Sequence, residues 1–556
     1  MANSKTSLSI TLAQLNPTVG DIAVNLETAV QACNQARKAG ADIIVFTELY
    51  LCGYPPEDLV LKPAFQNKCM EAVRALAKKC AIEGLTVIIG TIWADDEGLF
   101  NVAAILNNGI VETIRKKVDL PNYGPFDEKR VFAAGALPGP VDIHGVKIGV
   151  PICEDIWTDE IIECLEETGS EMLISLNSSP FYSEKQDVRL NVAVARVSES
   201  SLPLIYLNQV GGQDELVFDG ASFIMNKDHK IAVQCPQFEE AIVHTQWEKQ
   251  ECGWSCTTKQ IAPLHCPDTE NYHACVLGLR DYCRKNGFKE VVLGLSGGID
   301  SALCAAMAVD ALGSEAVHCV MLPFKYTSEE SLVDAKLCAD HLNVRYDILP
   351  IEAPVNGFSS ILAPLFEGTE TGITEENLQS RVRGTLIMAL TNKFGSMMLT
   401  TGNKSEMSVG YATLYGDMNG GFNPLKDLYK LQVYRLSAWR NANHIEDFKG
   451  PKGQVIPENI ITKAPSAELR EDQTDQDSLP PYEILDDILE QLIENEASIE
   501  AIVASGHDRK TAERIEHLLY IAEYKRRQSA PGVRVTKKYF GRDRRYPITN
   551  RWRDRN

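Results

Sequence analysis

An apolar strand that runs into a glycine-rich turn and then into a helix constrains the fold more than any other feature of this sequence. The string is Val291-Val292-Leu293-Gly294-Leu295-Ser296-Gly297-Gly298-Ile299-Asp300-Ser301. Its pattern and the residues after it predict a buried strand over 290–295, a helix over 301–312 and a second strand over 316–322. Strand, helix and strand in this order favour a doubly wound parallel sheet in the second half of the chain.

The turn in this string has the features of an anion-binding loop. Gly297 and Gly298 permit a tight turn and close approach to a ligand, and the start of the next helix presents N–H groups and a positive dipole end. Asp300 is placed to hold a Mg²⁺ ion bound to phosphate oxygens. The string lacks the lysine of the GxxxxGK(S/T) loop, which excludes the P-loop NTPases.

Two other interpretations of the same string stay open. Gly294 to Gly298 also fits GxSxG, the nucleophile elbow of esterases, which requires an acid and a histidine further along the chain. His341 and His444 are the candidates, and neither has a supporting sequence context. The string could also be an ordinary glycine-rich turn without a ligand.

The chain is too long for one hydrophobic core, since it has 556 residues. Its first half alternates short apolar runs with amphipathic helical stretches, which predicts a mixed α/β domain whose sheets are covered by helices. Asn107-Asn108-Gly109 predicts a hairpin turn between two of these runs. A polar segment with Gly and Pro indicates a boundary, so we expect a first domain over 1–250, a linker over 251–268 and a second domain over 269–556. After residue 431 we expect mainly helices, with a mobile loop around 464–481.

The composition disfavours several classes of function. A formal net charge of −21 opposes binding to nucleic acid or to an anionic membrane. No stretch reaches the roughly 18 to 20 consecutive apolar residues of a membrane span. Fifteen cysteines without CxxC pairs indicate reduced thiols, so we expect a soluble, cytoplasmic protein that acts on small molecules. In the basic segment over 525–553, we expect most charges to pair with acidic neighbours or with a sister subunit.

Three residues in the first half lie at the ends of strand-like runs and have side chains suited to nucleophilic catalysis. They are Glu48 in VFTELYLCGYPPEDL, Lys117 in IRKKVDLPNYGPFDEKRVF and Cys153 in VKIGVPICEDIW. Each residue type alone is commonly structural, because most buried cysteines are inert and most lysines are solvated. Each of the three also lies where a strand gives way to a loop with Pro or Gly, where rigid scaffolds often hold catalytic groups.

These three strings resemble the nitrilase superfamily, whose fold is an αββα sandwich. The resemblance implies that Cys153 attacks an amide carbon, that Glu48 takes and returns the proton, and that Lys117 stabilises the anionic intermediate. Two further strings, NSSPFYSEK and NQVGGQDELVFDGASF, resemble the glutaminase domains of NAD synthetases. That resemblance implies glutamine-binding roles for Tyr123, Ser179 and Lys185, and also for Phe126 and Glu128.

The loop SGGIDS resembles that of the ATP pyrophosphatases, which cleave ATP between the α and β phosphates. The resemblance implies that ATP contacts Gly294, Leu295, Ser296, Gly297, Gly298, Ile299, Asp300 and Ser301. The strings ENLQSRVRG, TTGNKSE and NPLKDL, which begin at residues 376, 400 and 423, are similar to those of NAD synthetases. They imply that Thr401 contacts ATP and that Asp300 and Glu406 hold Mg²⁺. They also imply that Asn377, Glu406 and Lys525 contact deamido-NAD.

The two halves together resemble the glutamine-hydrolysing NAD synthetases over nearly the whole chain. This implies a second domain of the ATP pyrophosphatase type with a helical C-terminal extension. It also implies that ammonia from L-glutamine amidates deamido-NAD through an adenylated intermediate, with ATP and Mg²⁺, in a homo-oligomer paired through its synthetase domains. Two alternatives remain, an amidase fused to a different ATP-dependent amide-forming domain and a catalytically silent relative. The first requires different strings around 377–406, and the second conflicts with the intact candidate residues.

Overall fold

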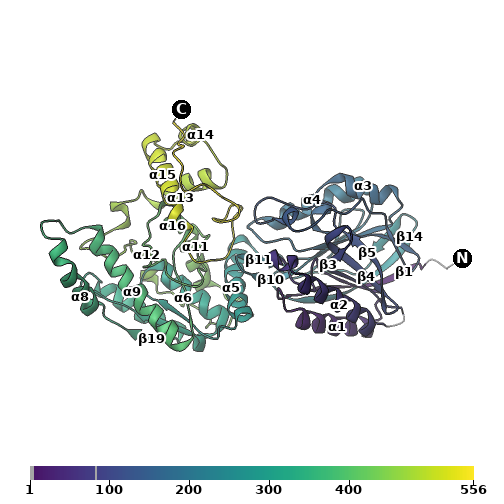
Figure 1. Ribbon diagram of the computed structural model, residues 1–556, viewed down its shortest axis with the longest axis horizontal. Helices are drawn as coiled ribbons and strands as arrows, with labels where there is room; N and C mark the ends of the chain where they lie inside the picture. The colour runs from purple at the N-terminus through teal and green to yellow at the C-terminus, as the bar shows by residue number, and fades with distance from the viewer. Residues whose placement is uncertain (1–4, 82–83, 556) are drawn as a thin grey trace. The chain divides into compact units, whose positions relative to one another are not determined.

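The chain forms two compact units, Met1–Cys266 and Pro267–Asn556, in a computed structural model that describes residues 5–81 and 84–555 (Figure 1). The segment over 251–268, which the sequence analysis assigned to a linker, contains two strands of the first unit. Strand β15 (Gly253–Cys256) pairs with β14 (Ala241–Gln250), and β16 (Gln260–Ile261) pairs with β13 (Ile231–Gln234). Most of the polar residues that suggested a linker lie beside and between these two short strands, and many of them are exposed.

The first unit contains two seven-stranded sheets. One has the order β15-β14-β1-β2-β3-β4-β5, with β1 (Ser7–Gln14), β2 (Ile43–Phe46), β3 (Thr86–Asp95), β4 (Gly98–Asn107) and β5 (Ile110–Lys116). The other has the order β16-β13-β12-β9-β8-β7-β6, with β6 (Val141–Ile143), β7 (Val146–Gly149), β8 (Met172–Asn177), β9 (Leu204–Asn208) and β12 (Phe223–Met225). A separate hairpin joins β10 (Val210–Gln213) and β11 (Leu216–Asp219).

Alternation of side chains along the strands explains how these sheets are stacked. In β1, Leu8 and Ile10 pack in one cluster with Ile148 and Ile174 of the second sheet. Residues of β2 that point the other way pack against α1 (Ile22–Lys38) and α2 (Pro63–Lys79). Helices α3 (Asp159–Glu167) and α4 (Lys185–Ser200) cover the outer face of the second sheet. The expected αββα sandwich is therefore confirmed.

The predicted hairpin at Asn107-Asn108-Gly109 is also confirmed. Strands β4 and β5 pair in an antiparallel manner around it. Asn108 has φ 50° and Gly109 has φ 83°, and a two-residue turn of this hand matches the twist of the strands that it joins.

The second unit contains a four-stranded sheet with the order β19-β18-β17-β20, and all its pairs are parallel. The strands are β17 (Val291–Gly294), β18 (Val317–Met321), β19 (Arg345–Ile348) and β20 (Met397–Met398). Val292 packs with Ile387 in one cluster, whereas its neighbours Val291 and Leu293 point to the opposite face and are equally buried. Both faces of the sheet are covered, as expected for a doubly wound fold.

Helices make up most of the rest of this unit. Those that precede or connect the strands are α5 (Pro267–Asn286), α6 (Ile299–Leu312), α7 (Glu329–Leu342), α8 (Glu352–Leu362) and α9 (Ile373–Phe394). Those beyond the last strand are α10 (Lys404–Val409), α11 (Lys430–Ala442), α12 (Glu458–Thr462), α13 (Tyr482–Ile493), α14 (Ile499–Ala504), α15 (Arg509–Ile521) and α16 (Glu523–Arg526). The expected helical C-terminal part is confirmed, and α13, α14 and α15 share their own apolar cluster.

Several charges of the basic C-terminal segment pair with acidic residues of the same unit, as the sequence analysis expected. Arg526, Arg527 and Arg544 all contact Glu523, and Arg534 contacts Asp543. Within the described residues, no helix combines the length and the apolar character needed to cross a membrane.

Candidate active sites

The structure brings Glu48 and Lys117 of the first unit into direct contact. Glu48 lies two residues beyond β2, and Lys117 directly follows β5. The Nζ atom of Lys117 lies 2.8 Å from Oε1 of Glu48, and neither side chain is exposed to solvent. Cys153 opens a short 3-10 helix, Cys153–Ile156, just after β7, and the charges of both Glu48 and Lys117 act on its thiol. The three predicted residues therefore form one buried cluster.

Backbone and amide groups fix the orientation of Glu48. Asn101 donates to Oε1 from Nδ2 at 2.8 Å, and the backbone N–H of Ser178 donates to Oε2 at 3.0 Å. The hydroxyl of Ser178 also donates to the carbonyl of Glu48 at 3.0 Å. Both carboxylate oxygens thus have fixed donors, which holds the side chain in one rotamer.

A second carboxylate, Glu128, also contacts Lys117. Both its oxygens lie 2.9 Å from Nζ, and it accepts a 2.9 Å hydrogen bond from the hydroxyl of Tyr54. Burial disfavours the ammonium, but the charges of Glu128 and Glu48 outweigh burial and hold the pKa of Lys117 well above its usual value. The sequence analysis grouped Glu128 with the glutamine-binding residues, whereas the structure places it as the second partner of Lys117.

The surroundings of Cys153 favour its protonated thiol. Burial raises its pKa well above the usual value, the charge of Glu48 raises it further, and Lys117 and the N–H of Ser178 only partly oppose this. Its backbone has φ 47°, in the left-handed region that a side chain rarely adopts. Such strained positions persist where the surrounding structure holds them, and they cluster at active sites.

Asp155 ties the cysteine loop to the lysine loop, and the sequence analysis did not single it out. Its carboxylate accepts hydrogen bonds from the backbone N–H groups of Ile152, Val118 and Asp119 at 2.9, 3.0 and 2.8 Å. Burial raises its pKa to about 7, although the three N–H groups oppose the shift. One side chain therefore joins the loop after Lys117 to the loop that carries Cys153.

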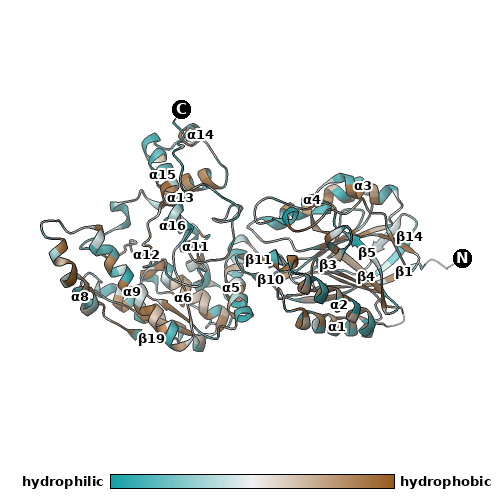
Figure 2. Cartoon of the chain, viewed as in Figure 1, coloured by the Kyte–Doolittle hydropathy of each residue, from teal (hydrophilic) through white to brown (hydrophobic). Residues whose placement is uncertain are grey.

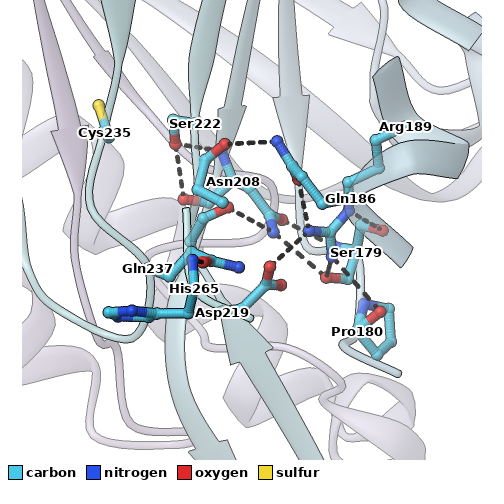
Figure 3. Close-up of polar contacts among 12 residues, drawn as sticks. Ser179, Pro180, Gln186, Arg189, Asn208, Asp219, Ser222, Cys235, Gln237 and His265 are labelled. Carbon is cyan, nitrogen blue, oxygen red and sulfur yellow. Dashed lines mark hydrogen bonds and ion pairs between the residues drawn. The ribbon is translucent and has the colours of Figure 1, made fainter. Parts of the chain in front are cut away.

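Two of the predicted glutamine-binding residues, Tyr123 and Lys185, lie around Glu154, the neighbour of Cys153. The hydroxyl of Tyr123 donates to Glu154 at 2.9 Å, and the charge of Lys185 acts on the same carboxylate. The ammonium of Lys185 also lies 4.2 Å from the ring centre of Trp157. Another of them, Ser179, is buried. Its N–H donates to Asn208, and its hydroxyl accepts from Nε of Arg189 at 3.2 Å (Figure 3).

In the second unit, the predicted phosphate loop connects β17 to α6. Gly297 has φ 81°, and a Cβ atom at this position would lie 2.4 Å from the carbonyl oxygen of Ser331, so only glycine fits. The loop lines a cavity of about 660 Å³ together with Thr401 and Glu406. Thr401, Glu406 and every residue from Gly294 to Ser301 except Gly297 belong to this lining.

A lysine lies between the two carboxylates that the sequence analysis assigned to Mg²⁺. The Nζ atom of Lys430 is 2.5 Å from Oδ2 of Asp300 and 2.9 Å from Oε1 of Glu406. Burial raises the pKa of Glu406 to about 7, and the two carboxylates hold the pKa of Lys430 above its usual value despite burial. Lys430 is a site residue that the sequence analysis missed, although it stands close behind the NPLKDL string.

The donor set fits a magnesium ion that arrives with a nucleotide. No group of three or more His, Cys, Asp or Glu side chains suited to a metal occurs over 5–81 and 84–555. Mg²⁺ commonly binds through one or two carboxylates and completes its octahedron with phosphate and water oxygens. Asp300 and Glu406 could supply that number of carboxylates to the cavity.

Asn377 and Lys525, predicted to contact deamido-NAD, lie against one short segment over 410–413. Thr413 donates its hydroxyl to Asn377 at 2.8 Å, and Nζ of Lys525 donates to the carbonyls of Gly410 and Ala412 at 2.7 Å each. Neither residue lines the 660 Å³ cavity, whereas Ala412 does. Both residues thus contact the segment that contributes Ala412 to the cavity wall.

The segment around 464–481, expected to be a mobile loop, contacts other residues at the cavity wall. Glu468 accepts hydrogen bonds from the hydroxyls of Ser328 and Ser331 at 2.7 and 2.8 Å, and Leu469 accepts one from the amide of Gln379. Much of the segment lines the cavity, so its polar composition reflects these contacts.

The esterase interpretation of the phosphate loop is wrong. The hydroxyl of Ser296 lies 3.2 Å from that of Ser301, and neither candidate histidine contacts it. Nε2 of His444 instead bonds to the carbonyl of Gly450, and His341 lies in the last turn of α7. No nucleophile and base are paired here, as a nucleophile elbow requires.

Comparison with known proteins agrees with this geometry. Residues 9–253 match the carbon-nitrogen hydrolase family, and residues 271–529 match the NAD synthase family. A glutamine-dependent NAD(+) synthetase from Rhodobacter capsulatus is 52% identical over 545 residues, covering 98% of this chain and 99% of the relative. The chain belongs to the glutamine-dependent NAD(+) synthetase family.

Two solved members of the glutamine-dependent NAD(+) synthetases cover nearly the whole chain. That from Acinetobacter baumannii, in complex with adenosine diphosphate, is 40% identical with a TM-score of 0.77, covering 99% of this chain and 100% of its own. That from Cytophaga hutchinsonii is 22% identical with a TM-score of 0.83, covering 98% of each chain, and supports the fold alone. The NAD synthase match also excludes an amidase fused to a different ATP-dependent domain.

Proposed function

We propose that this chain amidates deamido-NAD to NAD at the expense of ATP, with ammonia that it releases from L-glutamine. The observation that carries the proposal is the presence of two complete sites on one chain. The first unit has the buried Glu48, Lys117 and Cys153 cluster, and the second has the glycine-rich loop in a cavity with Asp300.

The arrangement of the first site supports a glutaminase reaction in two steps. Glu48 takes the thiol proton of Cys153 as Sγ attacks the amide carbon of glutamine, and Lys117 stabilises the oxyanion that forms. Glu48 then returns the proton to the departing ammonia, which leaves a thioester on Cys153. Water attacks this thioester with Glu48 as the base, and glutamate and the free thiol are restored. Tyr123, Ser179 and Lys185 are the proposed glutamine-binding residues.

The second site supports adenylation followed by amidation. The nicotinate carboxylate attacks the α phosphorus of ATP and pyrophosphate leaves, and ammonia then displaces AMP from the adenylated carboxyl group. The loop over 294–301 and Thr401 are the proposed ATP-binding residues, and all of them except Gly297 line the cavity. Asn377, Glu406 and Lys525 are the proposed contacts to deamido-NAD. Bound by Asp300 and Glu406, Mg²⁺ would neutralise charge on the phosphates.

One assay tests this function. The protein is incubated with ATP, Mg²⁺ and deamido-NAD, together with either glutamine or ammonium, and NAD is measured. We expect the wild type to form NAD from both nitrogen sources, and Cys153→Ala to form NAD from ammonium only. A wild type that forms no NAD from either source would refute the proposal.

The second unit also has an apolar surface that supports pairing of two copies. Ile361 on α8, Leu365 just beyond it and Ile373 at the start of α9 are each more than 70% exposed, and α8 is largely apolar in Figure 2. Exposed apolar side chains in one region commonly mark an interface. Ile361→Asp is expected to shift the protein toward monomer in analytical ultracentrifugation.

We further place the reaction in the cytoplasm, since all fifteen cysteines are unpaired.

A further inference from the structure

A fully buried arginine lies beneath the loop that follows β8, and the reaction steps above do not use it. Arg189 on α4 has no exposed surface. Its NH2 group donates to the carbonyl of Ser179 at 2.7 Å and to that of Pro180 at 3.4 Å, and its Nε donates to the hydroxyl of Ser179 (Figure 3). The guanidinium therefore contacts two consecutive carbonyls of one loop.

Asp219 fixes the other side of the same guanidinium. Its Oδ2 accepts from NH1 of Arg189 at 2.8 Å, and Gln186 accepts from NH1 at 3.3 Å. Asp219 ends β11 and is 1% exposed. A buried ion pair of this kind usually adds little stability relative to apolar residues of the same volume. The presence of the ion pair between Arg189 and Asp219 is better explained by the geometry that it imposes on the loop at Ser179 and Pro180.

The residue just before this anchored segment faces the catalytic cluster. The N–H of Ser178 donates to Glu48 Oε2 at 3.0 Å, and its hydroxyl donates to the Glu48 carbonyl. Ser179 and Pro180, the next two residues, are the ones that Arg189 contacts. Asn208 also holds this segment, because its side-chain oxygen accepts from the N–H of Ser179 at 2.8 Å. The backbone is thus held from one side by Arg189 while it presents Ser178 to Glu48 on the other.

We propose that Arg189, oriented by Asp219, is a positioning residue for glutamine hydrolysis that keeps the N–H of Ser178 directed at Glu48. This inference rests on the function proposed above. Arg189 acts through the loop and contacts no reacting atom. A guanidinium is required because one planar group must reach Asp219 and the carbonyl oxygens at the same time, which the single ammonium of a lysine does not do.

Two variants and one matched control test this role. Arg189→Met removes every donor, and Arg189→Lys keeps the charge opposite Asp219 without the planar fork. Arg196→Met is the control, because Arg196 lies on the same helix, is also largely buried and pairs with Glu199 rather than with the loop. Glutamate release from glutamine is measured with kcat and KM separated, alongside NAD formation from ammonium. Hydrogen exchange in β8 and α4 reports whether the first unit is folded.

We expect kcat for glutamate release to fall about 100-fold in Arg189→Met and at least about 10-fold in Arg189→Lys, the scale of loss for a misplaced catalytic group. KM for glutamine should also rise, but by a smaller factor, because Arg189 contacts Ser179, a proposed glutamine-binding residue. Ammonium-driven NAD formation and the control variant should keep wild-type rates. If Arg189→Met does not fold, Arg189→Lys decides. The inference is overturned if kcat survives in a folded variant, if only KM rises, or if Arg196→Met loses the same kcat. Failure of the wild type to form NAD would instead refute the proposed function, and glutamate release would still test Arg189.

Discussion

Lys430 balances the negative charge of the nucleotide cavity, so its replacement by methionine should destabilise the second unit. The lysine side chain is 2% exposed, and the side chains of Asp300 and Glu406 that it contacts are each 18% exposed. Removing one partner of a buried ion pair costs about 3–5 kcal/mol. Because both carboxylates retain some contact with cavity water, we expect the lower end, about 3 kcal/mol.

Hydrogen exchange followed by mass spectrometry on the full chain measures this loss locally. A decrease of about 3 kcal/mol makes exchange through unfolding about 100-fold faster. We expect this acceleration in α6, α10 and α11, which carry the three side chains. Peptides from β1, β8 and α4 of the first unit serve as the internal control and should exchange at wild-type rates.

A variant that lacks both the lysine and the two carboxylates separates the effect of lost charge balance from the effect of changed packing. Lys430 also lies 5.3 Å from the ring centre of Tyr482, so methionine changes packing as well as charge. Lys430→Met combined with Asp300→Asn and Glu406→Gln leaves no uncompensated carboxylate, and it should regain most of the lost protection. Unchanged exchange in Lys430→Met, or a triple variant no better protected than the single one, would show that the charge argument is wrong.

Three further predictions concern single residues. Glu128→Gln removes one of the two carboxylates that contact Lys117, so glutamate release should fall about 100-fold while ammonium-driven NAD formation persists. An equal loss of both activities would contradict this prediction. The pKa of Asp155 is raised by burial from 3.8 to about 7, so its contribution to stability is complete below pH 3.8 and is lost as the pH rises to 7. Asp155→Asn should remove this component, measured as the difference in unfolding temperature from wild type over that range. Gly297→Ala places a Cβ atom against the carbonyl oxygen of Ser331, so the loop over 294–301 must shift. The affinity for ATP, measured by calorimetry, should fall at least about tenfold, and the rate of glutamate release should not change.

The sequence predicted elements best where periodicity and turn chemistry agree. The strand, glycine turn and helix around Gly297 were recognised because an apolar run ends at residues that only a tight turn explains. Strands β15 and β16, at the end of the first unit, were not predicted because their sequences give no such signal. In β15, Trp254 and Cys256 are buried and alternate with Gly253 and Ser255, but four residues are too short for a period of two to stand out among polar neighbours.

Candidate site residues at strand ends could be predicted from the sequence, whereas the contacts that loop residues make with them could not. Glu48, Lys117 and Cys153 each lie at or just beyond the end of a strand-like run, which is a local signal. Glu128 lies in a 3-10 turn eleven residues after Lys117, and only the folded loop places its carboxylate on the lysine. Asp155 acts through three backbone N–H groups, which no side-chain pattern in a sequence can reveal.

Each unit holds a buried lysine between two carboxylates, and the difference in their exposure assigns them different roles. Lys117 and its partners Glu48 and Glu128 are at most 6% exposed, so little water reaches these contacts and the side chains keep their positions while Cys153 reacts. Around Lys430 the carboxylates open onto a cavity of about 660 Å³, where phosphate oxygens of a bound nucleotide can replace them as partners of the ammonium. Such an exchange would release Asp300 and Glu406 for a cation that arrives with the phosphates. The same pairing of charges thus rigidifies the first site, and in the second site it would change when a nucleotide binds.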